Sequence, residues 1–426
     1  MNQLKRRGGG YIMMRRYTHS ILMVLCIIAL WAGQCHGDLV VTSSLSVDEH
    51  YDTNIYLSSD HETSDFITDL ALSLGMADEG PTRTLSSHYT VSMVNFHRHS
   101  SGNYVGHSFD LGLDQRLSRT FGFHVTDVFY MSEEPLEEDP EITAVRRTRN
   151  RYYRNTAEAG FYYQFGEEDV LDMSYRDMRL RNEGEDVEDS DEYGPSVSLT
   201  YWITHRHGIV LSYSLLRTEY EYTPPHNTST WGAGYRFRWS AHTTLTADYS
   251  FEIFQDQESA PTDYKVHDLS VGFEHSLGPE WSVGGTIGYY LRDPEVGSDD
   301  TGYSYTLSLS KAFRRGTVGI TGSGGYREEY TDAERRGFTE YKAVALTGSY
   351  ALSERIELHS GITYDYEEAE ETDEMWSASL GASYLIRPWL TCSVDLTHRE
   401  RTSSVEEDEY RDSIIYFRLT AVHEWR

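Results

Sequence analysis

Apolar and polar residues alternate at every second position in many segments of this chain. One segment places Leu245, Ala247, Tyr249, Phe251 and Ile253 on one face, opposite Thr246, Asp248, Ser250 and Glu252. This period of two is that of a β-strand whose two faces meet different surroundings. Comparable segments follow one another from residue 40 to residue 426. They predict about 18 to 20 antiparallel strands of roughly 10 to 15 residues each.

The connections between these segments alternate between short and long. The short ones are residues 117–119, 240–242, 277–280, 314–316, 353–354 and 387–388. The long ones are mostly acidic and lie at residues 132–150, 181–192, 217–229, 292–302, 327–337, 367–374 and 399–412. The polar face of the predicted strands is rich in Asp, Glu, Ser and Gly. Such a face fits a water-filled barrel lumen better than it fits a soluble β-sandwich. We predict an all-β, transmembrane, antiparallel up-and-down barrel with short periplasmic turns and long acidic extracellular loops.

The last segment of the chain predicts how this barrel closes. Its outward set is Ile415, Phe417, Leu419, Ala421 and, by the same parity, Trp425, which only Arg426 follows. We expect this strand to pair with a first strand near residues 40–57, because the pairing removes both free edges of the sheet. A closing strand with a terminal aromatic residue also predicts recognition by the outer-membrane assembly machinery.

The composition of the 426 residues fits a barrel and predicts an export signal. Only 38% of the residues are hydrophobic, while tyrosine occurs 33 times and suits both strands and membrane interfaces. Residues 21–32 form an apolar core after Arg15 and Arg16, too short to span a membrane as a helix. We predict a cleaved signal peptide at residues 1–37 and an outer-membrane barrel at 38–426. A lipoprotein modified at Cys35 is the alternative.

Charge and cysteine content exclude several classes of function. The formal net charge is −31, and the predicted leader holds basic residues but no acidic ones. Such acidity opposes nucleic-acid binding, so no nucleic-acid partner is expected. Cys392 is the single cysteine beyond the leader, which leaves no disulfide and no cysteine-based metal or haem motif. We expect no cofactor.

Candidate chemical groups are scattered rather than assembled. His97, His99 and Ser100 lie in one connection, and His107 and Ser108 follow in the next strand. We interpret them as a polar loop and a lumen-facing pair, so we predict no enzyme and no catalytic residue. The acidic loops lack the spacing of an EF-hand, so we interpret them as solvated loops rather than metal sites.

One basic cluster is the exception. Its candidates for contact with lipopolysaccharide are Arg147, Arg149, Arg151, Arg179 and Arg181. Strand parity predicts that they face outward on neighbouring strands at the outer rim. Arginine binds phosphate in a forked geometry, which lipopolysaccharide would satisfy. The alternative is a solvated loop base in which these arginines balance nearby acids.

The first segment after the leader contains the pattern D-x-N-[I/V]-[Y/F], here Asp52 to Tyr56, followed by a Ser/Asp-rich loop at residues 58–65. In this pattern the segment resembles the opening of an outer-membrane β-barrel porin family, of the beta-barrel porin 2 type. The resemblance implies a barrel whose genes often neighbour exopolysaccharide or exosortase loci. It implies no catalytic residues.

Three functional hypotheses follow. The first is a channel or conduit, either porin-like or the outer-membrane pore of a polysaccharide export system, with outer-membrane lipid and small solutes or polysaccharide as partners. Its acidic lumen favours cations or neutral solutes, although inward arginines such as Arg292, Arg327, Arg399 and Arg401 oppose this locally. The second is a structural or adhesion barrel blocked by its own loops. The third is a barrel hydrolase.

Overall fold

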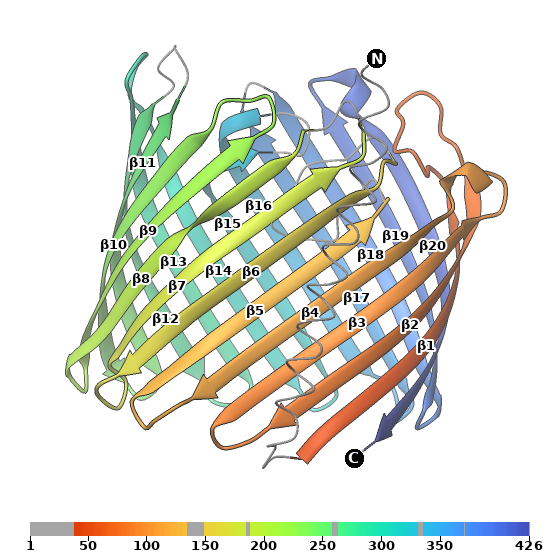
Figure 1. Ribbon diagram of the computed structural model, residues 1–426, viewed down its shortest axis with the longest axis horizontal. Helices are drawn as coiled ribbons and strands as arrows, with labels where there is room; N and C mark the ends of the chain where they lie inside the picture. The colour runs from red at the N-terminus through yellow and green to blue at the C-terminus, as the bar shows by residue number, and fades with distance from the viewer. Residues whose placement is uncertain are drawn as a thin grey trace, which may run out of the picture.

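A computed structural model describes residues 38–133, 149–184, 188–257, 263–330, 335–369 and 371–425. These residues form one closed antiparallel sheet of 20 strands, in which each strand pairs with its sequence neighbour and the last pairs with the first. The strands run obliquely around the barrel (Figure 1). The predicted fold class is confirmed, at the upper end of the predicted strand number.

The strands are β1 (Asp38–Asp52), β2 (Asp65–Glu79), β3 (Arg83–Phe96), β4 (Tyr104–Arg116), β5 (Phe121–Ser132), β6 (Tyr152–Gln164), β7 (Val170–Asn182), β8 (Ser190–Thr204), β9 (His207–Tyr220), β10 (His226–Ser240), β11 (Thr243–Asp256), β12 (Tyr264–Leu277), β13 (Trp281–Pro294), β14 (Asp300–Phe313), β15 (Gly316–Tyr330), β16 (Arg335–Ala351), β17 (Ile356–Glu368), β18 (Thr372–Arg387), β19 (Leu390–Ser403) and β20 (Tyr410–Trp425). Two short 3₁₀ turns, η1 (Ser100–Gly102) and η2 (Glu406–Asp408), lie in connections. No helix within the described residues is long and apolar enough to cross a membrane.

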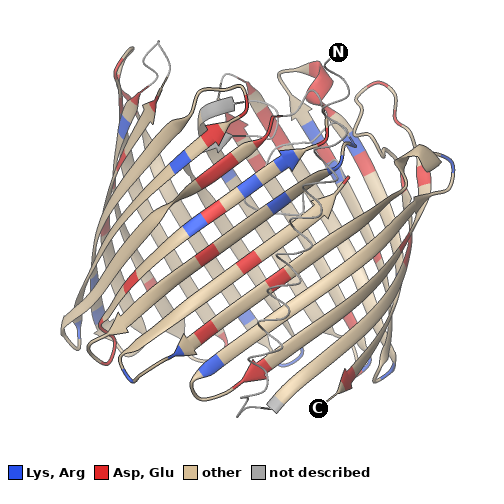
Figure 2. Ribbon diagram, in the orientation of Figure 1, with Lys and Arg blue, Asp and Glu red and all other residues tan. Residues whose placement is uncertain are grey.

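The two ends of the barrel differ in the length of their connections. All the predicted short connections lie at the end where β1 begins and β20 finishes, which we call the short-turn end. The other end, the long-loop end, carries most of the longer connections, such as residues 53–64 between β1 and β2. Acidic residues gather along its rim (Figure 2). The alternation of short and long connections read from the sequence therefore separates the two ends of the molecule correctly.

The closing pair forms as the alternation predicts. β1 and β20 pair from Val41 opposite Trp425 to Asp52 opposite Ile414, with Val47 opposite Leu419. Val47 is 42% exposed and Phe417 is 51% exposed, so both belong to the outer surface. The barrel therefore has no free edge between its first and last strands.

The outer surface is an apolar belt between two rings of aromatic residues. Trp239, Phe313 and Trp425 are exposed near the short-turn end, and Trp231, Tyr289 and Tyr303 are exposed nearer the long-loop end. Exposed Leu, Ile and Val side chains lie between the rings. Aromatic residues favour the interface between hydrocarbon and water, so the surface has the layering of an outer-membrane barrel.

Candidate functional site

The lumen is the candidate functional site, and small polar side chains line much of it. Across neighbouring strands, Ser73 and Thr90 lie 2.8 Å apart, as do Ser174 and Ser196, while Thr286 and Thr306 lie 2.6 Å apart. Nearer the short-turn end, inward residues such as Ser86 and Ser308 remain exposed. A barrel of this many strands is wider than its inward side chains can fill, so this part of the lumen has room for water.

Ionised side chains are distributed over the same inner wall, and acids outnumber bases at the described inward positions. Arg236 lies 2.6 Å from Asp248, and His359 lies 2.6 Å from Asp395. Glu274 and Glu357 are exposed inward acids nearer the short-turn end. Because partial pairing leaves an excess of carboxylates, the lumen presents a negative field to a solute.

The four arginines predicted to face inward do so. Arg401 lies 2.8 Å from Asp373, and both side chains are almost fully buried. Arg399 lies 3.9 Å from Asp412. Arg327 pairs with Glu367, and Arg292 stacks over the rings of Tyr264 and Phe338. All four lie towards the long-loop end, where they neutralise acids or cover aromatic rings.

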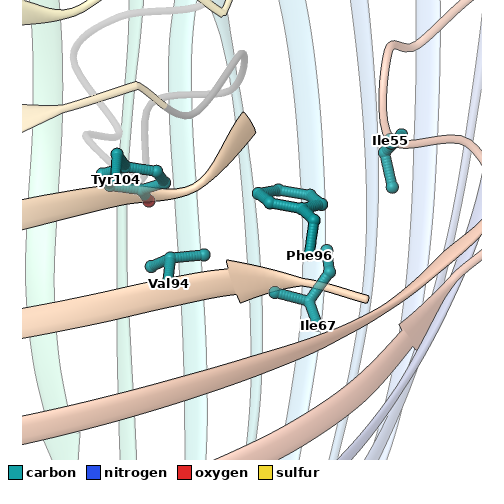
Figure 3. Packing of buried hydrophobic residues seen from close by; sticks show 5 residues of the cluster. All are labelled: Ile55, Ile67, Val94, Phe96 and Tyr104. Carbon is teal, nitrogen blue, oxygen red and sulfur yellow. The ribbon is translucent and has the colours of Figure 1, made fainter. Parts of the chain in front are cut away.

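A first hydrophobic cluster lies inside the barrel mouth. It consists of Ile55, Ile67, Val94, Phe96 and Tyr104, all at most 9% exposed. Ile67, Val94, Phe96 and Tyr104 project from the long-loop ends of β2, β3 and β4, and Ile55 comes from the connection between β1 and β2 (Figure 3). The β1–β2 connection therefore packs into the mouth instead of extending away from it.

Asn54 fixes this connection. Its side-chain amide donates to the carbonyl of Ser58 at 2.9 Å and to that of Arg411 at 3.0 Å, and its oxygen accepts from the Ser58 amide at 3.0 Å. The Asn54 backbone amide donates to Asp52 at 2.7 Å. Asn54 is fully buried. Asp52, Asn54 and Ile55 of the D-x-N-[I/V]-[Y/F] pattern thus tie the connection to β20 and direct an apolar residue inward.

We expect the substitution Asn54→Ala to lower the free energy of unfolding by about 2 kcal/mol, because the Ser58 and Arg411 carbonyls and the Ser58 amide lose their hydrogen-bond partner, which is fully buried. Urea unfolding of the protein refolded into phospholipid vesicles measures this change. Asn95→Ala is the matched control. Within the part of the chain that the structure describes, the exposed Asn95 amide donates only to the nearby Met93 carbonyl, so this substitution should change stability little. Equal effects of the two substitutions would contradict this role of Asn54.

Arg149 corrects one expectation from the sequence. Parity predicts that it faces outward, but its guanidinium lies 4.6 Å from the centre of the Phe96 ring, and its Nε donates to the Ile55 carbonyl at 2.9 Å. Both partners belong to the inward cluster, so the predicted orientation is wrong. The alternation of faces applies within a strand, and β6 begins only at Tyr152.

The remaining basic candidates lie at the rim among acids. Arg151 lies 2.9 Å from Glu133, Arg179 2.8 Å from Asp177, and Arg181 2.6 Å from Asp191. Arg147 lies outside the described residues. These pairs match the alternative in which the arginines balance nearby acids, and contact with lipopolysaccharide stays a prediction for the outward-facing members.

The histidines weighed for catalysis have structural partners. His99 Nδ1 lies 2.9 Å from the buried carboxylate of Asp65, which also accepts the His99 backbone amide. His97 contacts Thr68, and His107 contacts Tyr89. Within the described residues, neither Ser100 nor Ser108 is hydrogen-bonded to these histidines. A pair of nucleophile and base is therefore not assembled here.

A second segment also packs inside the barrel at the long-loop end, namely the outer part of the hairpin formed by β15 and β16, which no sequence pattern predicted. β14 pairs with β15 only as far as Tyr305 opposite Gly324. β15 continues with β16 alone, up to Tyr330 opposite Arg335. A Cβ at Gly324 would lie 2.7 Å from the Tyr305 ring, so this position requires glycine as the two strands separate. We call residues 325–330 and 335–341 the hairpin tip.

The hairpin tip packs against the inner wall of the barrel. Its Tyr326 and Phe338 contact a buried cluster of Phe254, Tyr264, Val266 and Tyr290, which are inward residues of β11, β12 and β13. The Tyr326 ring lies 4.8 Å from that of Tyr290, whose hydroxyl donates to Glu340. The hairpin tip has therefore left the wall and covers its inner face, because a hairpin that stayed in the wall could not reach inward residues.

A recess of about 510 Å³ adjoins the hairpin tip. Inward residues of β8 to β14 line one side, among them Glu252 and Asp268, and the hairpin contributes Tyr326, Arg327 and Tyr341. Glu252 and Asp268 lie on the short-turn side of Phe254 and Val266, along β11 and β12. The recess therefore faces the lumen on the short-turn side of the cluster that the hairpin tip covers.

Comparison with known proteins supports the architecture alone. No family model matches the chain, and no curated protein sequence matches it either. Its fold resembles a mutant of the ferric enterobactin receptor PfeA from Pseudomonas aeruginosa in complex with enterobactin, with TM-score 0.56 and 9% identity over 92% of this chain and 82% of that chain. It also resembles the siderophore receptor PirA from Pseudomonas aeruginosa, with TM-score 0.53 and 10% identity over 92% and 81%. The copper transporter OprC gives TM-score 0.55 and 8% identity over 91% and 81%.

Proposed function

We propose that this chain is an outer-membrane channel for small cations and neutral solutes, narrowed at its long-loop end. The observation that carries the proposal is the closed barrel of 20 strands, whose inner wall is polar, acidic and exposed towards the short-turn end. Folds of outer-membrane receptors and of a copper transporter resemble it, which agrees with a barrel that serves transport.

The apolar belt supports insertion into the outer membrane with the long-loop end outside. In this arrangement residues 1–37 are the leader removed on export, and β20 is the strand that the assembly machinery recognises. The rim arginines that face outward would meet lipopolysaccharide. Both ends of the sheet then lie on the periplasmic side, as expected for an even number of strands.

The excess of inward carboxylates gives the channel its charge preference. A pore lined by one sign of charge concentrates ions of the opposite sign and raises a barrier to ions of the same sign. A polyanionic polysaccharide would meet that barrier along the whole wall. A neutral polysaccharide would not meet this electrostatic barrier. If the chain exports a polysaccharide, the acidic lumen therefore favours a neutral one.

A structural barrel, closed by its own loops and serving as an anchor or adhesion platform, is the second candidate. The observation that favours it is the inward packing of both the β1–β2 connection and the hairpin tip at the long-loop end. A hydrolase has no comparable support, because the candidate histidines and serines do not form a catalytic pair in the described residues.

The refolded protein is expected to form ion channels in planar lipid bilayers and to prefer potassium over chloride by at least about twofold at 0.1 M salt. The preference should fall at 1 M salt, where the screening length shortens to about 3 Å. Reversal potentials in a potassium chloride gradient measure it.

Paired substitutions test whether lumen acids cause this preference. The double variant E274Q/E357Q removes two exposed inward carboxylates and should lower the preference for potassium. E280Q is the control, because Glu280 lies in the β12–β13 turn outside the strands. A correctly assembled barrel that never conducts would favour the structural candidate, and anion preference would contradict the acidic lumen.

A further inference from the structure

The recess beside the hairpin tip contains two carboxylates without a cationic partner. Asp268 accepts a hydrogen bond from Ser304 at 2.8 Å, and Glu252 accepts a long one from Thr230 at 3.4 Å. In the described part of the chain, neither carboxylate forms an ion pair. Arg327, the arginine that lines the recess, is already paired with Glu367. The recess therefore keeps a local negative charge.

The register brings these two carboxylates onto neighbouring strands. Asp268 lies opposite Ser250, and Glu252 lies opposite Val266, so the acids are diagonal neighbours on the inner face of β11 and β12. Diagonal neighbours in an antiparallel sheet are about 7 to 8 Å apart. Two like charges this close repel each other, and a bound cation between them or bridging them would relieve that repulsion.

The rest of the lining suits an organic cation. Tyr326 and Tyr341 present aromatic rings, which attract ammonium groups, and Ser270, Thr286 and Ser304 present hydroxyl groups. The volume of about 510 Å³ lies within the range of pockets that hold small molecules. In the described residues no three His, Cys, Asp or Glu side chains are grouped to hold a metal ion.

We propose that this recess binds a small organic cation with amine groups, such as a diamine. This inference rests on the proposed function for delivery of the ligand, which reaches the recess through the lumen. The carboxylates of Glu252 and Asp268 bind the amine groups, and the tyrosines of the hairpin tip cover the ligand. The recess is then a selectivity site placed directly beside the constriction.

The experiment is isothermal titration of 1,4-diaminobutane into the refolded chain in detergent micelles at low salt. The double variant E252Q/D268N should bind this diamine at least about tenfold more weakly than the wild-type protein, because both attractive charges are removed. The single variants should give intermediate losses. D110N is the matched control, since Asp110 is an inward acid of β4 that does not line the recess, and it should bind as the wild type does.

1,4-Butanediol, a neutral molecule of the same length as the diamine, is the comparison ligand. Heat-modifiable migration on gels checks that each variant is folded. Equal affinity of the wild type and E252Q/D268N for the diamine would overturn the proposal. An equal loss in D110N would overturn it as well, because general lumen charge would then be the cause. Equally tight binding of 1,4-butanediol and the diamine would also overturn it, because the positive charges would then not matter. Binding that depends on Glu252 and Asp268 in a protein that does not conduct would uphold the site and refute the channel.

Discussion

Replacing Gly325–Tyr341 by an Asn-Gly turn is expected to raise the single-channel conductance at least about twofold, because it removes the segment that narrows the lumen. Gly324 and Lys342 are paired in β15 and β16, so a two-residue turn can join them at the point where β15 still pairs with β14. The remaining hairpin should stay in the wall. Planar-bilayer recordings on wild type and variant measure the change.

The same variant should also be less stable than the wild-type protein, because removal of the hairpin tip exposes the inward cluster to water. Phe254, Val266 and Tyr290 are at most 1% exposed beneath the hairpin tip. Exposure of one such side chain costs roughly 1.5 to 3 kcal/mol when burial is complete. We therefore expect the midpoint of urea unfolding to fall while the barrel still assembles.

A matched truncation separates the constriction from loop length in general. In the control, an Asn-Gly turn replaces the exposed connection at residues 295–299 between β13 and β14, which does not contribute to the cluster. This control should conduct as the wild type does. If the hairpin variant and the control had the same conductance, the hairpin tip would not be the constriction.

Deletion of Phe417–Arg426 is expected to abolish assembly of the barrel. The deleted residues of β20 pair with β1 on one side and with β19 on the other. Their loss leaves two rows of backbone amide and carbonyl groups unpaired at membrane depth, and each such group costs several kcal/mol in hydrocarbon. The truncated chain should fail to show heat-modifiable migration on gels and should be degraded in cells.

Removal of Arg426 alone is the control, because every described pair of β20 remains. This variant should assemble. If the longer deletion showed normal heat-modifiable migration, closure of the barrel would not depend on the short-turn half of β20. If neither variant gave folded protein, loss of Arg426 alone would be enough to prevent assembly, and the lost strand pairing would not be the cause.

The strands and their faces could be predicted because the alternation is local. Ile415, Phe417 and Leu419 each fall on the outer face that parity assigns to them, and the short connections fall between the strands as expected. A strand held between two neighbours has one face towards lipid and one towards the lumen, so the sequence records that difference at every second position. The inward arginines Arg292, Arg399 and Arg401 of β13 and β19 were predictable for the same reason.

The same rule fails where a residue leaves the wall. Arg149 precedes β6, so its parity carries no information, and the structure turns it onto Phe96. Tyr326 and Phe338 have the parity of outward residues, yet the hairpin tip has left the wall and applies that face to the inside of β11, β12 and β13. Gly324 and Gly325 were the only local signal, and adjacent glycines mark a bend or close approach without giving its direction.

The sequence by itself determined the class of this protein: a closed antiparallel barrel with an apolar belt, a polar acidic inner wall, and long connections gathered at one end. These properties depend on the alternation of apolar and polar residues along each strand, and neighbouring residues of the sequence are enough to show that alternation. Only the tertiary structure decided which connections fold back into the mouth. That outcome depends on contacts between segments far apart in the chain, such as Asn54 with Arg411 and Tyr290 with Glu340, and no local pattern encodes them.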